Sequence, residues 1–366
     1  MIPFVDLKFQ YQSIKSEIDQ AIQSVIDTSA FVRGEYVEAF EHDYKALFGV
    51  DHCIPCGNGT DALYISLKAL GIGPGDEVIT TALSWIATSE VIAQCGAQVV
   101  FADIEPNYFT INPEDIKKKI TANTRAIIPV HLHGQAVDMD AIMSIADEYD
   151  LYVIEDCAQA HLGKYKGQTL GTFGTAGTFS FYPSKNLGAF GDAGAIISNN
   201  EDFAIKARMF ANHGALTKHE HEIEGINSRM DGIQAAVLTV KLKYLRAWNA
   251  KRRELADIYS QLLSQRAGIT APKIRPNSQH VFHLYVIQTE NRDALQEYLS
   301  TRNVSTGIHY PIALPYLKAY EYMGHQESDF PVAFQTTPKI LSLPIYPELN
   351  AEQVREIANI ARAGRS

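Results

Sequence analysis

A single lysine, Lys185, follows an apolar stretch of the chain and stands among small residues. The stretch is Phe179–Tyr182, and the turn after it reads PSKNLG. A lysine at the mouth of a sheet, near a bound phosphate and with its charge disfavoured by burial, can lose its proton and attack an aldehyde. Taken by itself, however, such a lysine more commonly lies in a surface loop.

Two adjacent acids, Glu155 and Asp156, stand at the end of another apolar stretch, in the sequence IEDCAQ. Strict strand alternation would turn one carboxylate toward the interior face of the sheet and the other away. A half-buried carboxylate needs a cationic partner. The alternatives for this segment are a helix cap and a structural ion pair.

A third segment, with the sequence GNGTD, follows the apolar residues His52–Cys56 and precedes a helix-like pattern. Its glycines let the backbone approach a ligand closely, and the N–H groups at a helix start, with the Thr60 hydroxyl, suit an anionic phosphate. A plain turn with a Thr or Asp helix cap is at least as probable for this motif alone.

Together the three segments supply the contacts that one cofactor needs. An amine for an aldehyde, an acid for a protonated ring nitrogen and a cradle for a phosphate match the three reactive ends of pyridoxal 5'-phosphate (PLP). The coincidence favours a PLP site over three unrelated structural features.

The elements that position these residues alternate between short apolar runs and helix-like stretches from about Val50 to Ser198. This alternation predicts an α/β fold with a mostly parallel, seven-stranded sheet and helices on both faces. Ligands of such sheets bind at the carboxyl ends of the strands, where the three segments lie. The expected strands are His52–Cys56, Glu77–Thr81, Gln98–Ala102, Arg125–Val130, Leu151–Glu155, Thr178–Tyr182 and Gly194–Ser198.

After Ser198 the alternation stops, and a long helical pattern over 233–263 predicts a connecting helix. A smaller α+β unit is expected beyond it, with strands at Val281–Gln288 and Val304–His309. Helices are expected near Arg292–Thr301 and from Ala351. We therefore predict a large domain over residues 1–240 and a small C-terminal domain over residues 241–366.

Composition excludes several function classes. The formal net charge of −10 argues against a nucleic-acid partner, and no tract is long and apolar enough to span a membrane. Cys53 and Cys56 form a Cys-x-x-Cys pair, but no second pair follows, so a buried strand is favoured over a metal or redox site. No metal is expected, and the start of the chain lacks a secretory signal pattern, which predicts a cytoplasmic protein.

The sequence resembles the DegT/DnrJ/EryC1/StrS family of sugar aminotransferases, within the fold-type-I PLP superfamily. The resemblance covers nearly the whole chain. It is carried by an ordered set of motifs, which are PFVDL, GEYVE, NGTDAL, PGDEVI, EDCAQAH, SFYPSKNLG, NSR, QAA and IHYP.

The resemblance implies roles for individual residues. Asp156 would pair with the ring nitrogen, Lys185 would form the Schiff base with the cofactor, and Gln159 would lie near the phenolic oxygen. Trp85 would lie against the ring, although a core or interface aromatic is the alternative. The residues implied to bind the phosphate are Gly59, Thr60, Ser180 and, from the other subunit of a homodimer with shared active sites, Asn227. For Asn227 the alternative is a helix cap.

In this family the amino acceptor is usually a nucleotide-linked keto-sugar and the donor is usually glutamate. The N-terminal motif and Tyr11 are most similar to members acting on a 3-keto sugar carried by dTDP or UDP. His309 and Tyr310 would lie near the acceptor, with His161 as a further candidate that is equally well explained as a core histidine. The chain departs from many relatives by lacking a histidine after HYPIALPY and by having His133 where tyrosine is common.

Three other functions fit parts of the pattern. A PLP-dependent sugar dehydratase of the same superfamily would have histidine in place of Lys185. A non-catalytic regulatory homologue would retain the fold, and a complete set of Lys185, Asp156 and Gln159 argues against it. A cyclitol aminotransferase would share the cofactor chemistry, and the sequence does not distinguish it from a nucleotide-sugar enzyme.

Overall fold

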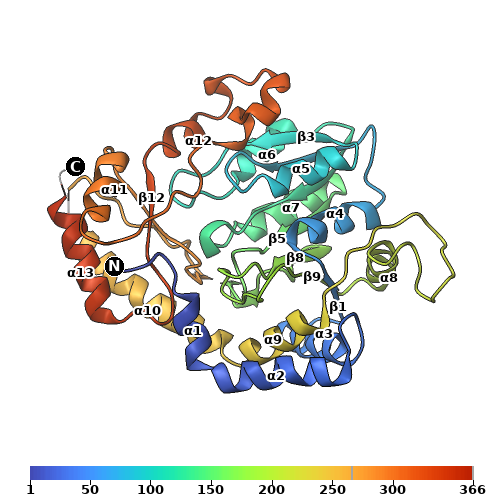
Figure 1. Cartoon of the computed structure of the whole chain (residues 1–366). Coiled ribbons are helices and arrows are strands. Elements are labelled where there is room, and N and C mark those ends of the chain that lie inside the picture. The colour runs from blue at the N-terminus through green and yellow to red at the C-terminus, as the bar shows by residue number, and fades with distance from the viewer. Residues whose placement is uncertain (265–266, 365–366) are drawn as a thin grey trace.

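The computed structural model describes residues 1–264 and 267–364. A twisted sheet runs through the larger part of the molecule, with helices on both of its faces. Most of the C-terminal helices, drawn in orange and red, gather to one side of this sheet (Figure 1). None of the helices in the described ranges is long and apolar enough to cross a membrane.

The central sheet has seven strands in the order β1-β9-β8-β5-β4-β2-β3, which confirms the predicted α/β class. Only β9 runs antiparallel to its neighbours, β1 and β8. The strands are buried on both faces, which explains their nearly continuous apolar sequences. Their bounds are β1 His52–Cys56, β2 Glu77–Thr81, β3 Gln98–Ala102, β4 Thr124–Ile128, β5 Tyr152–Asp156, β8 Ala176–Ser180 and β9 Gly194–Ser198.

One face of the sheet is covered by α4 (Gly59–Ala69), α5 (Ala87–Gln94) and α8 (Glu201–Phe210). The other face packs against helices that bury Phe40, Ile116, Met139 and Leu238. Those helices are α3 Glu35–Phe48, α6 Pro113–Lys119, α7 Met139–Tyr149 and α9 Gly232–Leu242. Two helices precede α3 in the chain, α1 Leu7–Ser13 and α2 Lys15–Thr28, and α2 packs along α9 (Figure 1).

The predicted single connecting helix is two helices. The first, α9, ends at Leu242, and α10 spans Leu245–Leu263. The break falls where Lys243 and Tyr244 cap the two ends, and neither Gly nor Pro marks it. The continuous apolar periodicity of the sequence therefore hid a change of direction.

The C-terminal part contains a two-stranded antiparallel sheet of β11 (Tyr285–Gln288) and β12 (Ile340–Leu343). The strand expected at Val304–His309 is not formed, because this segment makes only single bridges, from Val304 to Ile2 and from Gly307 to Ser342. Two helices complete this part, α11 Arg292–Ser300 and α13 Ala351–Ala363. The remaining short elements are β6 Lys164–Tyr165, β7 Gln168–Thr169, β10 Ser278–Gln279, η1 Leu132–Gly134, η2 Leu314–Tyr316, η3 Lys318–Met323, η4 Glu327–Asp329 and α12 Pro331–Thr336.

Two segments cross the predicted boundary at residue 240. Near the N-terminus, Ile2 and Val5 pack into the C-terminal core with α10 and α13. Conversely, Leu314, Tyr320 and Phe330 join the core of the large sheet. The division near residue 240 stays a proposal, and the two parts share buried surface.

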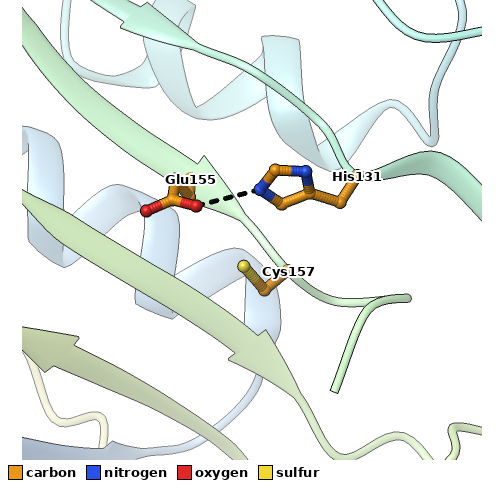
Figure 2. Close-up of side chains that lie close together, drawn as sticks. All are labelled: His131, Glu155 and Cys157. Atoms are coloured by element: carbon orange, nitrogen blue, oxygen red, sulfur yellow. Dashed lines mark hydrogen bonds and ion pairs between the residues drawn. The ribbon is translucent and has the colours of Figure 1, made fainter. Parts of the chain in front are cut away.

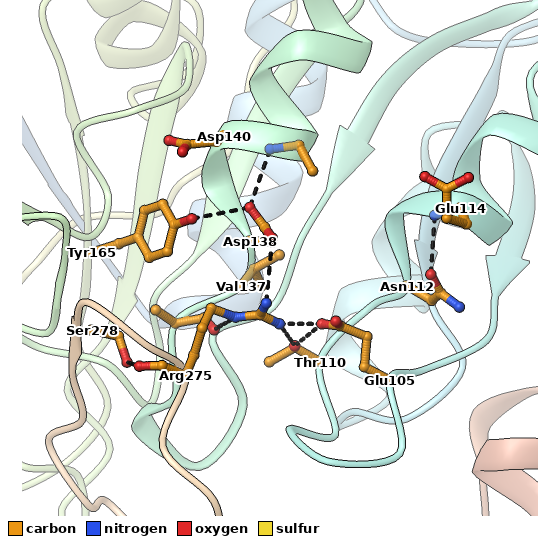
Figure 3. Close-up of polar contacts among 12 residues, drawn as sticks. Glu105, Thr110, Asn112, Glu114, Val137, Asp138, Asp140, Tyr165, Arg275 and Ser278 are labelled. Carbon is orange, nitrogen blue, oxygen red and sulfur yellow. Dashed lines mark hydrogen bonds and ion pairs between the residues drawn. The ribbon is translucent and has the colours of Figure 1, made fainter.

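Arg275 joins the segment after α10 to the large sheet. Its buried guanidinium pairs with Glu105 and lies 3.4 Å from Asp138, and its Nε donates to the Ala136 carbonyl at 3.1 Å (Figure 3). The ring of Tyr108 covers the guanidinium at 4.3 Å. Because this one cation satisfies acceptors from several loops, it fixes where the C-terminal part meets the sheet.

Candidate active site

A cavity of about 890 Å³ opens at the carboxyl ends of β5 and β8, beside the start of α4. Most of the residues that the sequence singled out lie on its wall. These are Gly59, Thr60, Trp85, Asp156, Gln159, Ser180, Lys185, His309 and Tyr310. The topology brings together segments that are more than a hundred residues apart in the chain.

The start of α4 forms one end of the cavity. Asn58 caps this helix, and its side chain accepts a hydrogen bond from the Asp61 N–H at 2.8 Å. The backbone N–H groups of Gly59 and Thr60 lie in the same first turn of α4, where the helix itself provides no hydrogen-bond acceptor. A Cβ on Gly59 would lie 2.6 Å from the Cβ of Ser180, so glycine is required for this close approach. The arrangement forms a tight cradle of donors for an anion.

Asp156 ends β5 and is buried in the cavity wall. Its carboxylate accepts hydrogen bonds from the Thr88 hydroxyl at 2.9 Å and the Ala158 N–H at 3.1 Å. Burial raises the pKa of Asp156, and these hydrogen bonds oppose the increase. A cation placed in the cavity would therefore gain a fixed, poorly solvated counter-charge.

Lys185 lies in the turn after β8, where its N–H donates to the Tyr182 carbonyl at 2.8 Å. Its amine makes no hydrogen bond or ion pair within the described ranges. Burial lowers the pKa of Lys185 to about 8, although the charge of Asp156 opposes the decrease. At pH 7 about a tenth of this amine is thus uncharged, far more than at the ordinary lysine pKa, and the uncharged form is the one that a nucleophilic lysine requires.

A second buried lysine fixes the same turn. Lys241 on α9 donates to the Gly188 carbonyl at 2.7 Å, and its amine lies 4.7 Å from the ring centre of Phe190. A Cβ on Gly188 would lie 2.2 Å from the Pro183 carbonyl oxygen, so the turn is closely packed. These contacts hold the segment that presents Lys185.

Gln159 connects the two sides of the cavity. Its amide oxygen accepts from the His133 N–H at 2.6 Å, and its amide nitrogen donates to the Tyr310 hydroxyl at 3.0 Å. The His133 side chain donates from Nε2 to the His309 carbonyl at 2.9 Å. Burial lowers the pKa of His133 to about 3, so the ring is neutral. His133, for which the sequence offered no role, therefore anchors His309 and Tyr310.

His133→Phe should keep the volume of this side chain but lose its hydrogen bond to the His309 carbonyl. We expect about a tenfold increase in KM for the amino acceptor, because a freed, buried carbonyl destabilises the segment that carries His309 and Tyr310. Steady-state kinetics with donor and acceptor varied separately would measure it. His133→Tyr, which keeps a hydroxyl donor, is the matched control, and an unchanged KM in the Phe variant would show that the anchor is dispensable.

Trp85 is 59% exposed although it lies on the cavity wall, and its ring centre is 5.7 Å from that of Tyr310. His309 stacks on Phe4 and shares a hydrogen bond of 2.8 Å between its Nδ1 and the Ser342 hydroxyl. An uncovered indole facing a cavity leaves a flat apolar surface for a ligand ring.

Two predicted site residues do not line the cavity. His161 is fully buried between Phe179 and Phe181, and neither of its ring nitrogens has a hydrogen-bond partner. Burial lowers the pKa of His161 to about 3. Asn227 is exposed and pairs with Asn212 in a loop beyond α8. Their roles stay predictions.

The second acid of the pair, Glu155, faces a different environment. Its carboxylate accepts from the N–H groups of Gly171, Phe173 and Gly174 and lies 3.0 Å from Nε2 of His131 (Figure 2). Cys157 completes a buried group with the composition of a metal site. Because the oxygens of Glu155 are already saturated by donors, the group is best explained as a hydrogen-bonded support for the end of β5.

Thr88, His133 and His283 are among the polar residues of the cavity region to which the sequence patterns assigned no role. Thr88 and His283 line the cavity. Thr88 lies on α5 and His283 precedes β11, outside the segments that follow the sheet strands. A helix-face threonine and an isolated histidine carry no local signal of their role, so only the packing reveals them.

A family comparison gives the context for this geometry. Residues 12–362 match the DegT/DnrJ/EryC1/StrS aminotransferase family. The chain belongs to this family. Its members are PLP-dependent aminotransferases.

Individual relatives extend the match over nearly the full length. The chain is 44% identical to a pleiotropic regulatory protein of Geobacillus stearothermophilus, covering 99% of each chain. It is 39% identical to dTDP-3-amino-3,4,6-trideoxy-alpha-D-glucose transaminase of Streptomyces venezuelae, covering 99% of this chain and 95% of that one. The crystal structure of S. venezuelae DesV in complex with a ketimine intermediate is 39% identical and superposes with a TM-score of 0.97, covering 99% of this chain and 98% of that one.

Proposed function

We propose that this protein is a PLP-dependent aminotransferase that moves an amino group from glutamate to C3 of a dTDP- or UDP-linked keto-sugar. The observation that carries the proposal is the convergence of Lys185, Asp156 and the Gly59–Thr60 cradle on one cavity. The names of the family and of the S. venezuelae transaminase support it.

The residues present fit the cofactor. Gly59, Thr60 and Ser180 would hold its phosphate, Asp156 its ring nitrogen and Lys185 its aldehyde carbon. When bound, PLP supplies an electron sink that allows an amino group to leave one carbon and be placed on another. The tight Gly59 contact and the unpaired amine of Lys185 are the features of this chain that suit such a group.

The protein's own residues would then control charge and protons. The Asp156 carboxylate, held by Thr88 and Ala158, would keep a proton on the ring nitrogen. The Lys185 amine, with its pKa lowered to about 8, would take up and return a proton at the reacting carbons. His309 and Tyr310 line the cavity, where they would contact the sugar.

An assay panel tests this proposal. Glutamate would be supplied with dTDP- and UDP-linked 3-keto and 4-keto sugars, and also with a keto-cyclitol. We expect turnover with a 3-keto nucleotide sugar at rates well above the other acceptors. Turnover of the cyclitol alone would favour the cyclitol aminotransferase, and sugar deoxygenation without amino transfer would favour the dehydratase.

A regulatory function is the second candidate, because the 44% identical relative carries a regulatory name. The complete set of Lys185, Asp156 and Gln159 in the cavity favours an enzyme. Binding of a nucleotide sugar with no amino transfer to any member of the panel would favour the regulatory function.

The expected cytoplasmic location stays a prediction, which cell fractionation would check.

We further propose that the active species is a homodimer whose sites are shared. In the single chain Asn227 lies outside the cavity and is exposed. Large apolar side chains in the neighbouring segments are also exposed, namely Phe31, Val32, Leu216 and Ile223. Such a patch favours an interface with a second copy, which would bring Asn227 to the partner's phosphate cradle.

Mixing two inactive variants tests the shared site. Lys185→Ala removes the amine, and Asn227→Asp should repel the cofactor phosphate by like charge. After subunit exchange of an equal mixture, we expect activity to return to about a quarter of the parental level, because half the dimers have one intact site. No recovery despite verified exchange, or full activity in a monomer, would contradict the proposal.

A further inference from the structure

His283 lies on the wall of the cavity together with Lys185, although it comes from the segment that precedes β11. Its side chain is only 9% exposed. The hydrogen bonds around it define which of its ring nitrogens carries hydrogen.

Two buried asparagines, Asn186 and Asn249, fix the hydrogen-bonding pattern around His283. Nδ2 of Asn249 donates to the His161 carbonyl at 2.8 Å, so its Oδ1 is the atom that accepts from Asn186 at 2.8 Å. Nδ2 of Asn186 also donates to the Val281 carbonyl at 3.0 Å. These carbonyls fix the orientation of both amides, because a carbonyl only accepts.

The remaining atom of the Asn186 amide, Oδ1, lies 3.2 Å from Nδ1 of His283. An amide oxygen cannot donate, so Nδ1 of His283 must carry the hydrogen of this bond. In the neutral ring, Nε2 then has a free lone pair. No partner for Nε2 occurs within residues 1–264 and 267–364, which makes it the polar atom that the ring offers to the cavity.

The surroundings keep this ring neutral. The ionisable groups that act on His283 are Lys185, Arg252, His309 and His161, and each lowers its pKa further below the value set by burial. Arg252 also donates to the carbonyls of Phe282 at 3.2 Å and His283 at 3.4 Å, which fixes the backbone. The neutral His283 ring therefore adds no second positive charge beside Lys185.

We propose that Nε2 of His283 accepts a hydrogen bond from the Lys185 amine when that amine carries a proton. His283 is then a positioning residue, which holds the proton carrier in place. The inference rests on the proposed function, in which Lys185 is the reacting amine. A neutral acceptor suits this role because it stabilises the ammonium without removing its proton.

Two substitutions separate the two nitrogens of the ring. His283→Asn keeps a donor near the position of Nδ1, toward Asn186, but has nothing at the position of Nε2. His283→Gln extends far enough to place an amide oxygen near that position. His280→Asn is the matched control, because His280 is also buried and lies outside the cavity wall.

The first readout is the ionisation of Lys185 in the cofactor-free, full-length protein. Reductive methylation would be followed across pH by mass spectrometry of the Lys185 peptide. We expect the midpoint in His283→Asn to fall by about 1 pH unit, since an acceptor that stabilises the ammonium has been removed. His283→Gln should recover most of the shift, and His280→Asn should match the parent.

The second readout uses the parental protein, so it does not depend on a variant folding. Nitrogen-15 spectra of histidine-labelled protein should show Nδ1 protonated and Nε2 bare for His283, with the signal assigned by its loss in His283→Gln. A protonated Nε2, or an unchanged midpoint in a folded His283→Asn variant, would overturn the inference. Both readouts are independent of turnover, so failure of the proposed function would not be mistaken for failure of this one.

Discussion

Lys185→Ala is expected to abolish amino transfer while leaving the fold intact. The variant loses both the nucleophile for the cofactor aldehyde and the proton carrier, so the rate should fall by about 10,000-fold or more. In the structure the amine makes no hydrogen bond within the described ranges, so its removal breaks none of the printed contacts that hold the fold. Turnover by coupled assay and the thermal unfolding midpoint would be measured together.

Lys206→Ala is the matched control for this substitution, since Lys206 is exposed on α8 and does not line the cavity. It should retain parental activity and stability. If Lys185→Ala turned over at a rate within tenfold of the parent, Lys185 could not be the proton carrier.

Asp156→Asn is expected to retain the cofactor but lose about a hundredfold in rate. The amide keeps the size and part of the hydrogen bonding to Thr88 and Ala158, but it cannot hold a proton on the ring nitrogen. Loss of one charge-assisted contact of this kind costs about 3 kcal/mol, which corresponds to that factor. Single-turnover kinetics at saturating cofactor would measure the effect.

Thr88→Val tests how much the position of the Asp156 carboxylate matters when its charge is kept. It removes the 2.9 Å hydrogen bond to the Asp156 carboxylate but leaves the carboxylate in place. We expect a loss of about tenfold, the usual effect of one buried hydrogen bond to a charged group. A parental rate in Asp156→Asn would instead favour a structural role for Asp156 through its hydrogen bonds with Thr88 and Ala158.

The sheet could be predicted from the sequence because its strands are short, apolar and separated by helical patterns. All seven expected strands are present, with ends shifted by no more than about two residues, as for β4 and β8. The strands of the C-terminal part were harder to predict from the sequence. Val304–His309 has a strand-like composition, but its partners are Ile2 and Ser342, which are distant in the chain and form only single bridges.

The site was predictable where chemistry coincides with a strand end. Asp156 ends β5, the Gly59–Thr60 pair comes shortly after β1, and Lys185 lies in the turn after β8, so local sequence and topology place them together. His133 and His283 act through long-range hydrogen bonds, to the His309 carbonyl and to Asn186, that no local pattern encodes. The role predicted for Asn227 would require a second chain and stays a prediction.

Borohydride reduction followed by peptide mapping would identify the lysine that binds the cofactor. The purified protein, loaded with PLP, would be reduced, digested and examined by mass spectrometry for the lysine that carries the cofactor. We expect one labelled peptide, with the cofactor on Lys185, and no label in Lys185→Ala. A label on another lysine, such as the buried Lys241, or no covalent label at all, would contradict it.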